Sequence, residues 1–203
     1  MKNYAVSFFA RFIILGALAI IVGCASTQPP KFYILNSIEK QAGQQKGSDA
    51  IQNITIGIDS IEIPDYLDRS QIVTRSSRSE LKIDEFNRWA GSLKENISLV
   101  VAENLSFLLL TDRVFVHPWI SADSVNYWIH VKIIRLDIIP DNTVTMKALW
   151  TISGDRGKKE YITRTSEFTE KIGENSYCTI VAAMSRTFEK LSQEIASEIE
   201  KLK

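Results

Sequence analysis

Long stretches in which apolar and polar residues alternate place the strongest constraint on the fold of this chain. Over 144–152 every second residue is apolar, and over 127–138 a similar alternation changes phase near its middle. A period of two is typical of strands with one buried face, and a change of phase predicts a bulge or a strand that serves two apolar surfaces. The residues Gly-Asp-Arg-Gly over 154–157 predict a turn into a polar strand over 160–170. Together these segments predict an antiparallel meander.

Two other segments place apolar residues every three or four positions, which is the spacing of an amphipathic helix. The first covers 84–109, with Asp84 as the expected N-cap. The second covers 176–202, with Asn175 or Ser176 as the cap. Strands, a helix, more strands and a last helix predict an α+β domain in which both helices pack on a mainly antiparallel sheet. Packing on the sheet is favoured over an intermolecular coiled coil for both helices.

The N-terminal segment 1–23 is typical of a secretory signal rather than of a folded domain. It contains Lys2, Arg11, an uncharged apolar run over 12–23 and no acidic residue. That run would form about 18 Å of helix, which is too short to cross a hydrocarbon core of about 30 Å. The string Ile-Val-Gly-Cys that ends at Cys24 resembles the bacterial lipobox, whose cysteine receives a diacylglycerol before the signal is cleaved. An uncleaved membrane anchor with an incidental cysteine is the alternative.

Lipidation of Cys24 would hold the protein on a membrane essentially permanently, because three acyl chains bury many methylene groups. In bacterial lipoproteins, an aspartate directly after the lipidated cysteine resembles a signal for retention at the inner membrane. This chain has Ala25 at that position. We therefore expect attachment to the outer membrane, facing the periplasm. If Cys24 carries lipid, Cys178 is left unpaired in an oxidising compartment.

The tether between the lipidation site and the domain is short. Seven residues separate Cys24 from Phe32, where the first strand is expected, and they span at most about 25 Å. We expect a signal peptide over 1–23, a lipidated tether over 24–31 and a single domain over 32–203. The domain must then work close to its membrane.

Charge narrows the choice of partners. The chain has 24 basic and 24 acidic residues, and loss of Lys2 and Arg11 with the signal leaves the domain slightly acidic. This balance excludes a nucleic-acid-binding protein that works by neutralising phosphates. It also disfavours binding to anionic lipid head groups by charge alone, so contact with lipid or a partner is expected through apolar and aromatic side chains.

Residues that could support catalysis are sparse. His117 and His130 are the two histidines, and neither has Cys, Asp or Glu at the usual spacing of a zinc site. The sequence contains no nucleophile elbow and no dinucleotide fingerprint. Cys178 lies at the start of the expected last helix, without a histidine nearby in the sequence. We therefore predict no catalytic residue, no metal ion and no cofactor, and a domain that binds or supports other molecules.

Four tryptophans are candidates for an interaction surface. Trp89 and Trp150 fall on apolar stripes and are expected in the core. Trp119, in an expected loop, and Trp128, on a strand face with polar neighbours, are the candidates for partner binding.

Several strings resemble the family of PqiC-like ABC-type transport auxiliary lipoproteins. They are CASTQPPKFYIL from Cys24, IPDYLDRSQIVTR from Ile63, and Arg-Trp-Ala from Arg88. The resemblance is weaker after Ala90. Similar proteins often have an acidic residue followed by Pro-Leu at this point, whereas this chain has Gly-Ser-Leu from Gly91. The resemblance extends over essentially the whole chain after the signal.

The resemblance implies a non-enzymatic docking component of a lipid-transport apparatus. In such systems an inner-membrane permease works with a periplasmic MCE-type protein that forms a passage toward the outer membrane. The resemblance makes Tyr66, Leu67, Arg69 and Arg75 candidates for a segment that faces a partner or another subunit. The alternative is that Tyr66 and Leu67 close the end of the sheet. Strands that change phase could also expose apolar surface for a homo-oligomer.

A second function of a different class is an outer-membrane lipoprotein that activates a peptidoglycan synthase. Such a protein must reach inward through the cell wall, which requires a long disordered linker. The seven residues between Cys24 and Phe32 disfavour that function. A periplasmic hydrolase is disfavoured by the lack of catalytic motifs.

Overall fold

The structure is a computed structural model that describes residues 28–39, 54–59, 61–118, 125–139, 142–174 and 176–202. Cys24, Trp119 and Asn175, which the sequence marked as a lipidation site, a binding residue and a helix cap, lie outside the described residues. Within the described ranges, no helix has both the length and the hydropathy needed to cross a bilayer.

Three long antiparallel strands form the body of a five-stranded sheet with the order β5-β2-β6-β7-β8. The predicted meander is therefore confirmed. Two short strands extend the sheet on one side, and β2 pairs in parallel with both of its neighbours. The bounds of these strands are β2 Ile56–Ile58, β5 Val114–Val116, β6 Tyr127–Ile139, β7 Thr143–Gly154 and β8 Lys159–Lys171.

The predicted change of phase in the segment 127–138 is a β-bulge. The pairing of β6 with β7 shifts in register between Ile133 and Arg135. Ile134, the extra residue, is exposed, whereas the apolar residues on both sides of it, Val131, Ile133, Leu136 and Ile138, are buried. The bulge therefore lets one strand keep its apolar residues on the core side while the strand bends.

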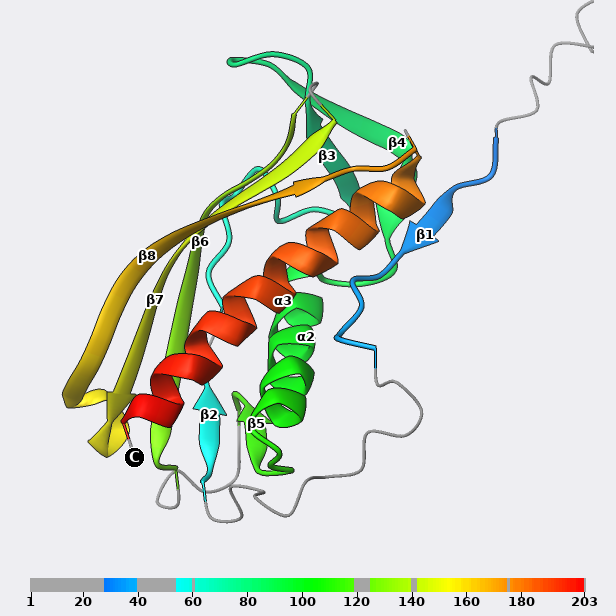
Figure 1. Ribbon diagram of the computed structural model, residues 1–203. Coiled ribbons are helices and arrows are strands. Elements are labelled where there is room, and N and C mark those ends of the chain that lie inside the picture. Colours follow the sequence, from blue (N-terminus) through cyan, green and yellow to red (C-terminus); the bar gives the residue numbers. More distant parts are fainter. Residues whose placement is uncertain are drawn as a thin grey trace, which may run out of the picture.

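A separate three-stranded sheet with the order β1-β4-β3 lies at one end of the molecule, beside the start of the last helix (Figure 1). Its strands are β1 Lys31–Tyr33, β3 Gln71–Arg75 and β4 Leu81–Trp89. β4 pairs in parallel with β1 and antiparallel with β3. Most of β4 is exposed, and only Trp89 at its end is buried in the core.

Two helices complete the domain, α2 Leu93–Leu108 and α3 Tyr177–Lys201. Figure 1 shows α3 running diagonally across one face of the five-stranded sheet, with α2 beside it. The predicted last helix is confirmed with Ser176 as its N-cap, where the side chain accepts a hydrogen bond from the backbone N–H of Thr179 in a capping box. Fully buried residues of α3, among them Phe188, Leu191 and Ile195, join those of β7 in one hydrophobic core.

The first helix begins later than the sequence predicted. Residues 84–89 belong to β4, and Ser92 caps the helix by accepting a hydrogen bond from the backbone N–H of Glu95. The Asp84 carboxylate accepts hydrogen bonds from two backbone N–H groups, as an N-cap would, but it does so inside an irregular strand. The sequence therefore correctly predicted that Asp84 caps backbone N–H groups, but the prediction that it begins a helix was wrong.

The α+β class and the packing of two helices on sheet are confirmed, but the strands form two sheets that contain both parallel and antiparallel pairs. The short strands β1, β2 and β5 are responsible for the difference. Three residues carry too little alternation to predict a partner strand, and their partners lie far away in the sequence.

Candidate partner-binding surface

The segment predicted to face a partner runs through the turn at 64–70 into β3. Tyr66 is half-buried, Leu67 is buried in the core and Arg69 is exposed. Arg75, at the end of β3, retains 22% of its side-chain exposure. The structure therefore brings together an inward-facing anchor, Leu67, and outward-facing polar groups on one short segment. The burial of Leu67 agrees with the alternative prediction that this residue helps to close the end of the sheet.

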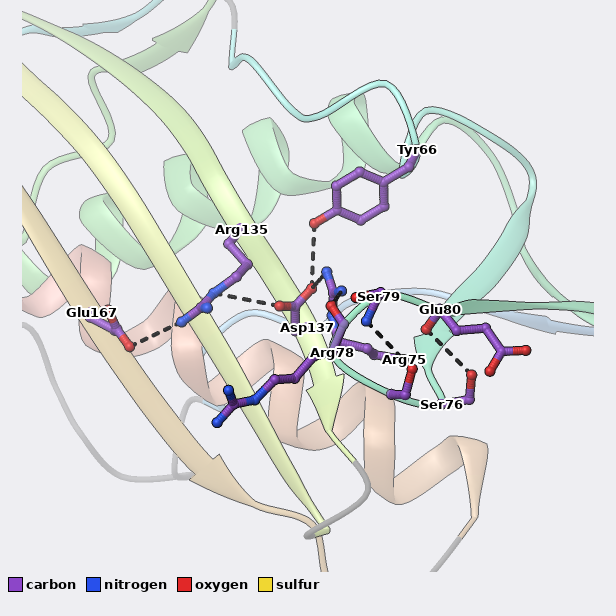
Figure 2. A network of polar contacts seen from close by, with 10 residues as sticks. Tyr66, Arg75, Ser76, Arg78, Ser79, Glu80, Arg135, Asp137 and Glu167 are labelled. Carbon is purple, nitrogen blue, oxygen red and sulfur yellow. Dashed lines mark hydrogen bonds and ion pairs between the residues drawn. The ribbon is translucent and has the colours of Figure 1, made fainter.

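Asp137 of β6 connects this segment to the rest of the molecule (Figure 2). Arg75 Nη2 donates a hydrogen bond to Asp137 Oδ1 over 3.0 Å, and Tyr66 Oη donates to the same oxygen over 3.5 Å. On the other side, Arg135 Nε lies 3.5 Å from Asp137 Oδ2, and Arg135 Nη2 donates to Glu167 Oε1 over 3.2 Å. This network joins β3 of the small sheet to β6 and β8 of the large sheet.

The Asp137 carboxylate is 4% exposed, so its charge needs partners within the protein. The hydrogen bond to this carboxylate raises the pKa of Arg75, which keeps the guanidinium charged. Burial raises the pKa of Tyr66, and the negative charge of Asp137 raises it further, so the phenol stays a neutral donor. Arg75 Nη1 also donates to the backbone carbonyl of Arg78 over 2.9 Å, which fixes the hairpin between β3 and β4.

A groove of about 200 Å³ lies where β1, the end of β4 and the start of α2 meet. Its walls are mainly apolar and include Tyr33, Ile34, Trp89, Leu93 and Leu99. Ile34 and Leu99 are more than half exposed. The sequence alone did not predict this groove, because its walls come from 33–34 and 89–99, two stretches that lie far apart in the chain.

Two asparagines of α2 hold the chain that forms one wall of the groove. Asn96 Oδ1 accepts a hydrogen bond from the backbone N–H of Leu35 over 2.7 Å, and Asn104 Oδ1 accepts one from Ile38 over 2.8 Å. Asn104 is fully buried, so its side-chain amide forms hydrogen bonds with groups of the protein, such as the backbone N–H of Ile38, rather than with water. A polar residue on the apolar stripe of a helix was the sequence signal that could have identified Asn104.

A tyrosine pair attaches the small sheet to the start of α3. Tyr177 Oη donates a hydrogen bond to Asp84 Oδ2 over 2.9 Å, and Tyr33 Oη donates to Asn87 Oδ1 over 2.8 Å. The two tyrosine rings are in contact, with 5.9 Å between their centroids. Burial raises the pKa of Asp84, but hydrogen bonds from Asn87, Tyr177 and the backbone outweigh it and lower the pKa overall.

Of the remaining residues singled out in the sequence, Trp89 lines the groove, and the others lie outside both sites. Trp89 and Trp150 are buried, as predicted, while Trp128 in β6 is half-buried. His130 Nε2 lies 3.5 Å from Glu62 Oε1 at the surface, and Cys178 is exposed. Over the part of the chain that the structure describes, no group of three or more His, Cys, Asp or Glu residues could hold a metal ion.

Comparison with known proteins supplies the family. The family model of the ABC-type transport auxiliary lipoprotein component matches residues 33–196. The crystal structure of an uncharacterized protein is 19% identical, with a TM-score of 0.69, over 85% of this chain and 99% of that chain. A crystal structure of a Xanthomonas campestris protein is 11% identical, with a TM-score of 0.58, over 83% of this chain and 91% of that chain.

These two structures are similar to this chain in fold. Among curated proteins, none matches the chain significantly. The family match reaches from β1 almost to the end of α3, so it includes both sheets, both helices, the Asp137 network and the groove. On this basis the chain belongs to the ABC-type transport auxiliary lipoprotein family.

Proposed function

We propose that this protein is an outer-membrane-anchored periplasmic lipoprotein that acts as a docking component of an MCE- and ABC-type intermembrane lipid transport system. The family match over 33–196 is the observation that carries this proposal, because it makes the chain an auxiliary component of ABC-type transport. The lipobox-like string that ends at Cys24 and the following Ala25 support anchoring in the outer membrane. The periplasmic MCE-type protein and its inner-membrane permease are the proposed partners.

The short tether supports a division of labour between the lipoprotein and its partner. In this proposal residues 1–23 are removed, residues 24–31 form the tether and residues 32–203 form one domain. A tether of at most about 25 Å leaves the domain beside its membrane. The MCE-type partner must therefore bridge the periplasm, and the lipoprotein receives it at the outer membrane.

The segment from Tyr66 to Arg75 is the proposed contact with this partner. Arg69 is exposed at the centre of this segment, and the buried Leu67 supports the backbone beneath it. The bonds from Tyr66 and Arg75 to Asp137 hold the segment in a fixed position, which lowers the entropy lost on binding. Trp119 and Trp128 are further proposed contacts.

Crosslinking in cells followed by affinity purification tests the proposed partner. We expect the wild-type lipoprotein to recover an MCE-type protein and Arg69→Glu to recover much less, because a reversed charge at the interface opposes binding. Arg113→Glu is the matched control, since Arg113 is also exposed but lies beside β5. Both variants should retain the wild-type unfolding temperature.

Recovery of a penicillin-binding protein in place of an MCE-type protein would contradict the proposal and would support activation of a peptidoglycan synthase. The anchor is tested separately by feeding cells with labelled palmitate. We expect label on the wild-type protein and none on Cys24→Ala. Fractionation of the membranes then shows whether the labelled protein is in the outer or the inner membrane.

A further inference from the structure

The three most exposed large apolar residues among those that the structure describes lie at the groove or in the strand that leads to it. Phe32 is 62% exposed, Ile34 is 57% exposed and Leu99 is 56% exposed. Ile34 and Leu99 line the groove from opposite elements, and Phe32 lies two residues before Ile34. We call Phe32, Ile34 and Leu99 the β1 patch.

The β1 patch is also the described apolar surface nearest to the proposed anchor along the chain. Phe32 is eight residue steps from Cys24 and Ile34 is ten, so the patch lies within about 26–36 Å of the lipidated cysteine. Helix α2 starts at the groove and extends away from it for 16 residues, or about 24 Å. β5, with the exposed Phe115, lies near the far end of this helix (Figure 1).

We propose that the β1 patch contacts the surface of the bilayer in which Cys24 is anchored, so that the domain rests on the membrane through Phe32, Ile34 and Leu99. This inference rests on the proposed lipid anchor. A short tether that ends beside exposed apolar side chains keeps these side chains at high effective concentration near the membrane. Contact with the bilayer would remove their apolar surface from water.

The structure also explains why the patch would be presented rigidly. Asn96 and Asn104 bind the backbone that follows Ile34, and Ser185 Oγ of α3 accepts a hydrogen bond from the backbone N–H of Asn36 over 3.1 Å. Ile34 is therefore fixed against both helices. Membrane contact at this point would orient the whole domain, with β5 and the opposite end of α2 directed away from the bilayer.

Depth-dependent fluorescence quenching tests the proposal on the lipidated full-length mature protein in vesicles of phosphatidylethanolamine and phosphatidylglycerol. An environment-sensitive dye is placed by Ile34→Cys in a Cys178→Ser background, where Cys24 is blocked by its lipid. Apolar interfacial residues enter a membrane by about 5–10 Å, so a nitroxide on the upper acyl chain should lower the emission about two-fold. Leu99→Cys, on a different element, should behave alike.

Phe115→Cys is the matched control, because Phe115 is also exposed and apolar but belongs to β5, which lies near the end of α2 that is distant from the groove. We expect no quenching at this position. Equal quenching at positions 34 and 115, or none at position 34, would overturn the proposal. Flotation of the labelled protein with the vesicles reports on the anchor alone, so a failed anchor is distinguished from a patch that does not touch lipid.

Two other occupants of the groove give different results. A single lipid held in the groove would give quenching that saturates at a low mole fraction of nitroxide lipid, whereas bilayer contact gives quenching that grows with the mole fraction. A second copy of the chain would shift the emission with protein density but without lipid quenching. Either of these results would overturn the proposal, while the crosslinking of an MCE-type partner would be unaffected.

Discussion

The two sheets of this domain differ in how they are stabilised. The large sheet contributes β7, in which most residues are buried, and it packs under α3 in one continuous core. The small sheet contributes β4, in which Leu81, Ile83 and Phe86 are exposed. Its connections to the large sheet and to α3 include two polar contacts, Arg75 with Asp137 and Tyr177 with Asp84.

This difference indicates a division of roles within one domain. A sheet with a deep apolar core tolerates little change, because packing energy depends on volume and shape. The small sheet joins this core through Ile72, Val73 and Trp89, but most of β4 is exposed, so its exposed residues can change without loss of the fold. The small sheet and the groove beside it are therefore the regions where binding properties can vary, and the proposed partner segment and the β1 patch both lie there.

Phe188→Ala should have the largest effect, because it removes a fully buried ring from α3. Loss of a buried phenylalanine costs about 3–5 kcal/mol of unfolding free energy. Urea denaturation followed by circular dichroism measures this change. Both sheets should lose protection from hydrogen exchange together, and retention of wild-type stability would contradict the assignment of the core to the face between α3 and β7.

Asp137→Asn should destabilise the protein by about 2 kcal/mol, less than for a fully buried ion pair because Arg75 and Arg135 retain contact with water. The loss should be local. Hydrogen exchange should accelerate in β3 and β4 while β7 stays protected. Glu167→Gln is the control, since Glu167 is an exposed partner of Arg135 and should change stability by less than about 0.5 kcal/mol. Uniform acceleration across both sheets would contradict the proposed separation.

Tyr177→Phe should lower stability by about 1.5 kcal/mol, because it removes a hydrogen bond to a carboxylate. The pKa of Asp84 is lower in the folded protein than in the unfolded chain. Its contribution to stability is therefore present above about pH 4 and is lost as the pH falls through the lowered pKa. The variant should lose less stability between pH 7 and pH 3 than the wild type. Tyr161→Phe, on an exposed tyrosine of β8, is the control, and an unchanged pH profile in Tyr177→Phe would contradict a role for this bond.

The same comparison separates what the sequence could predict from what it could not. The large sheet and α3 were predictable, because alternation over 127–138 and 144–152 and the helical stripe after Ser176 are long local patterns. Even the bulge in β6 had a signal, since the phase of the apolar residues changes there. The small sheet was missed, because β1 is short and because the backbone contacts of Asp84 resemble those of a helix cap.

The candidate site was predictable only in part. The strings that carry the family resemblance included Tyr66 and Arg75, but their common partner Asp137 lies 62 positions beyond Arg75. No local pattern connects residues at that distance. An aspartate between two apolar residues of a strand was a sign that a buried charge needed a partner, but it did not identify which one. The groove depends on two stretches that lie far apart in the chain, 33–34 and 89–99, and required the fold.

Leu99→Ser should have the smallest effect on stability. Leu99 is more than half exposed on α2, so its replacement removes little buried surface and should change the free energy of unfolding by less than about 0.5 kcal/mol. Leu105→Ser, at a fully buried position on the same helix, is the matched contrast and should cost several times more, because it leaves a cavity and an unpaired hydroxyl. Denaturation of both variants in urea gives the comparison. A large loss in Leu99→Ser would show that the groove supports the fold, and its exposed apolar residues would then have a structural reason instead of a binding one.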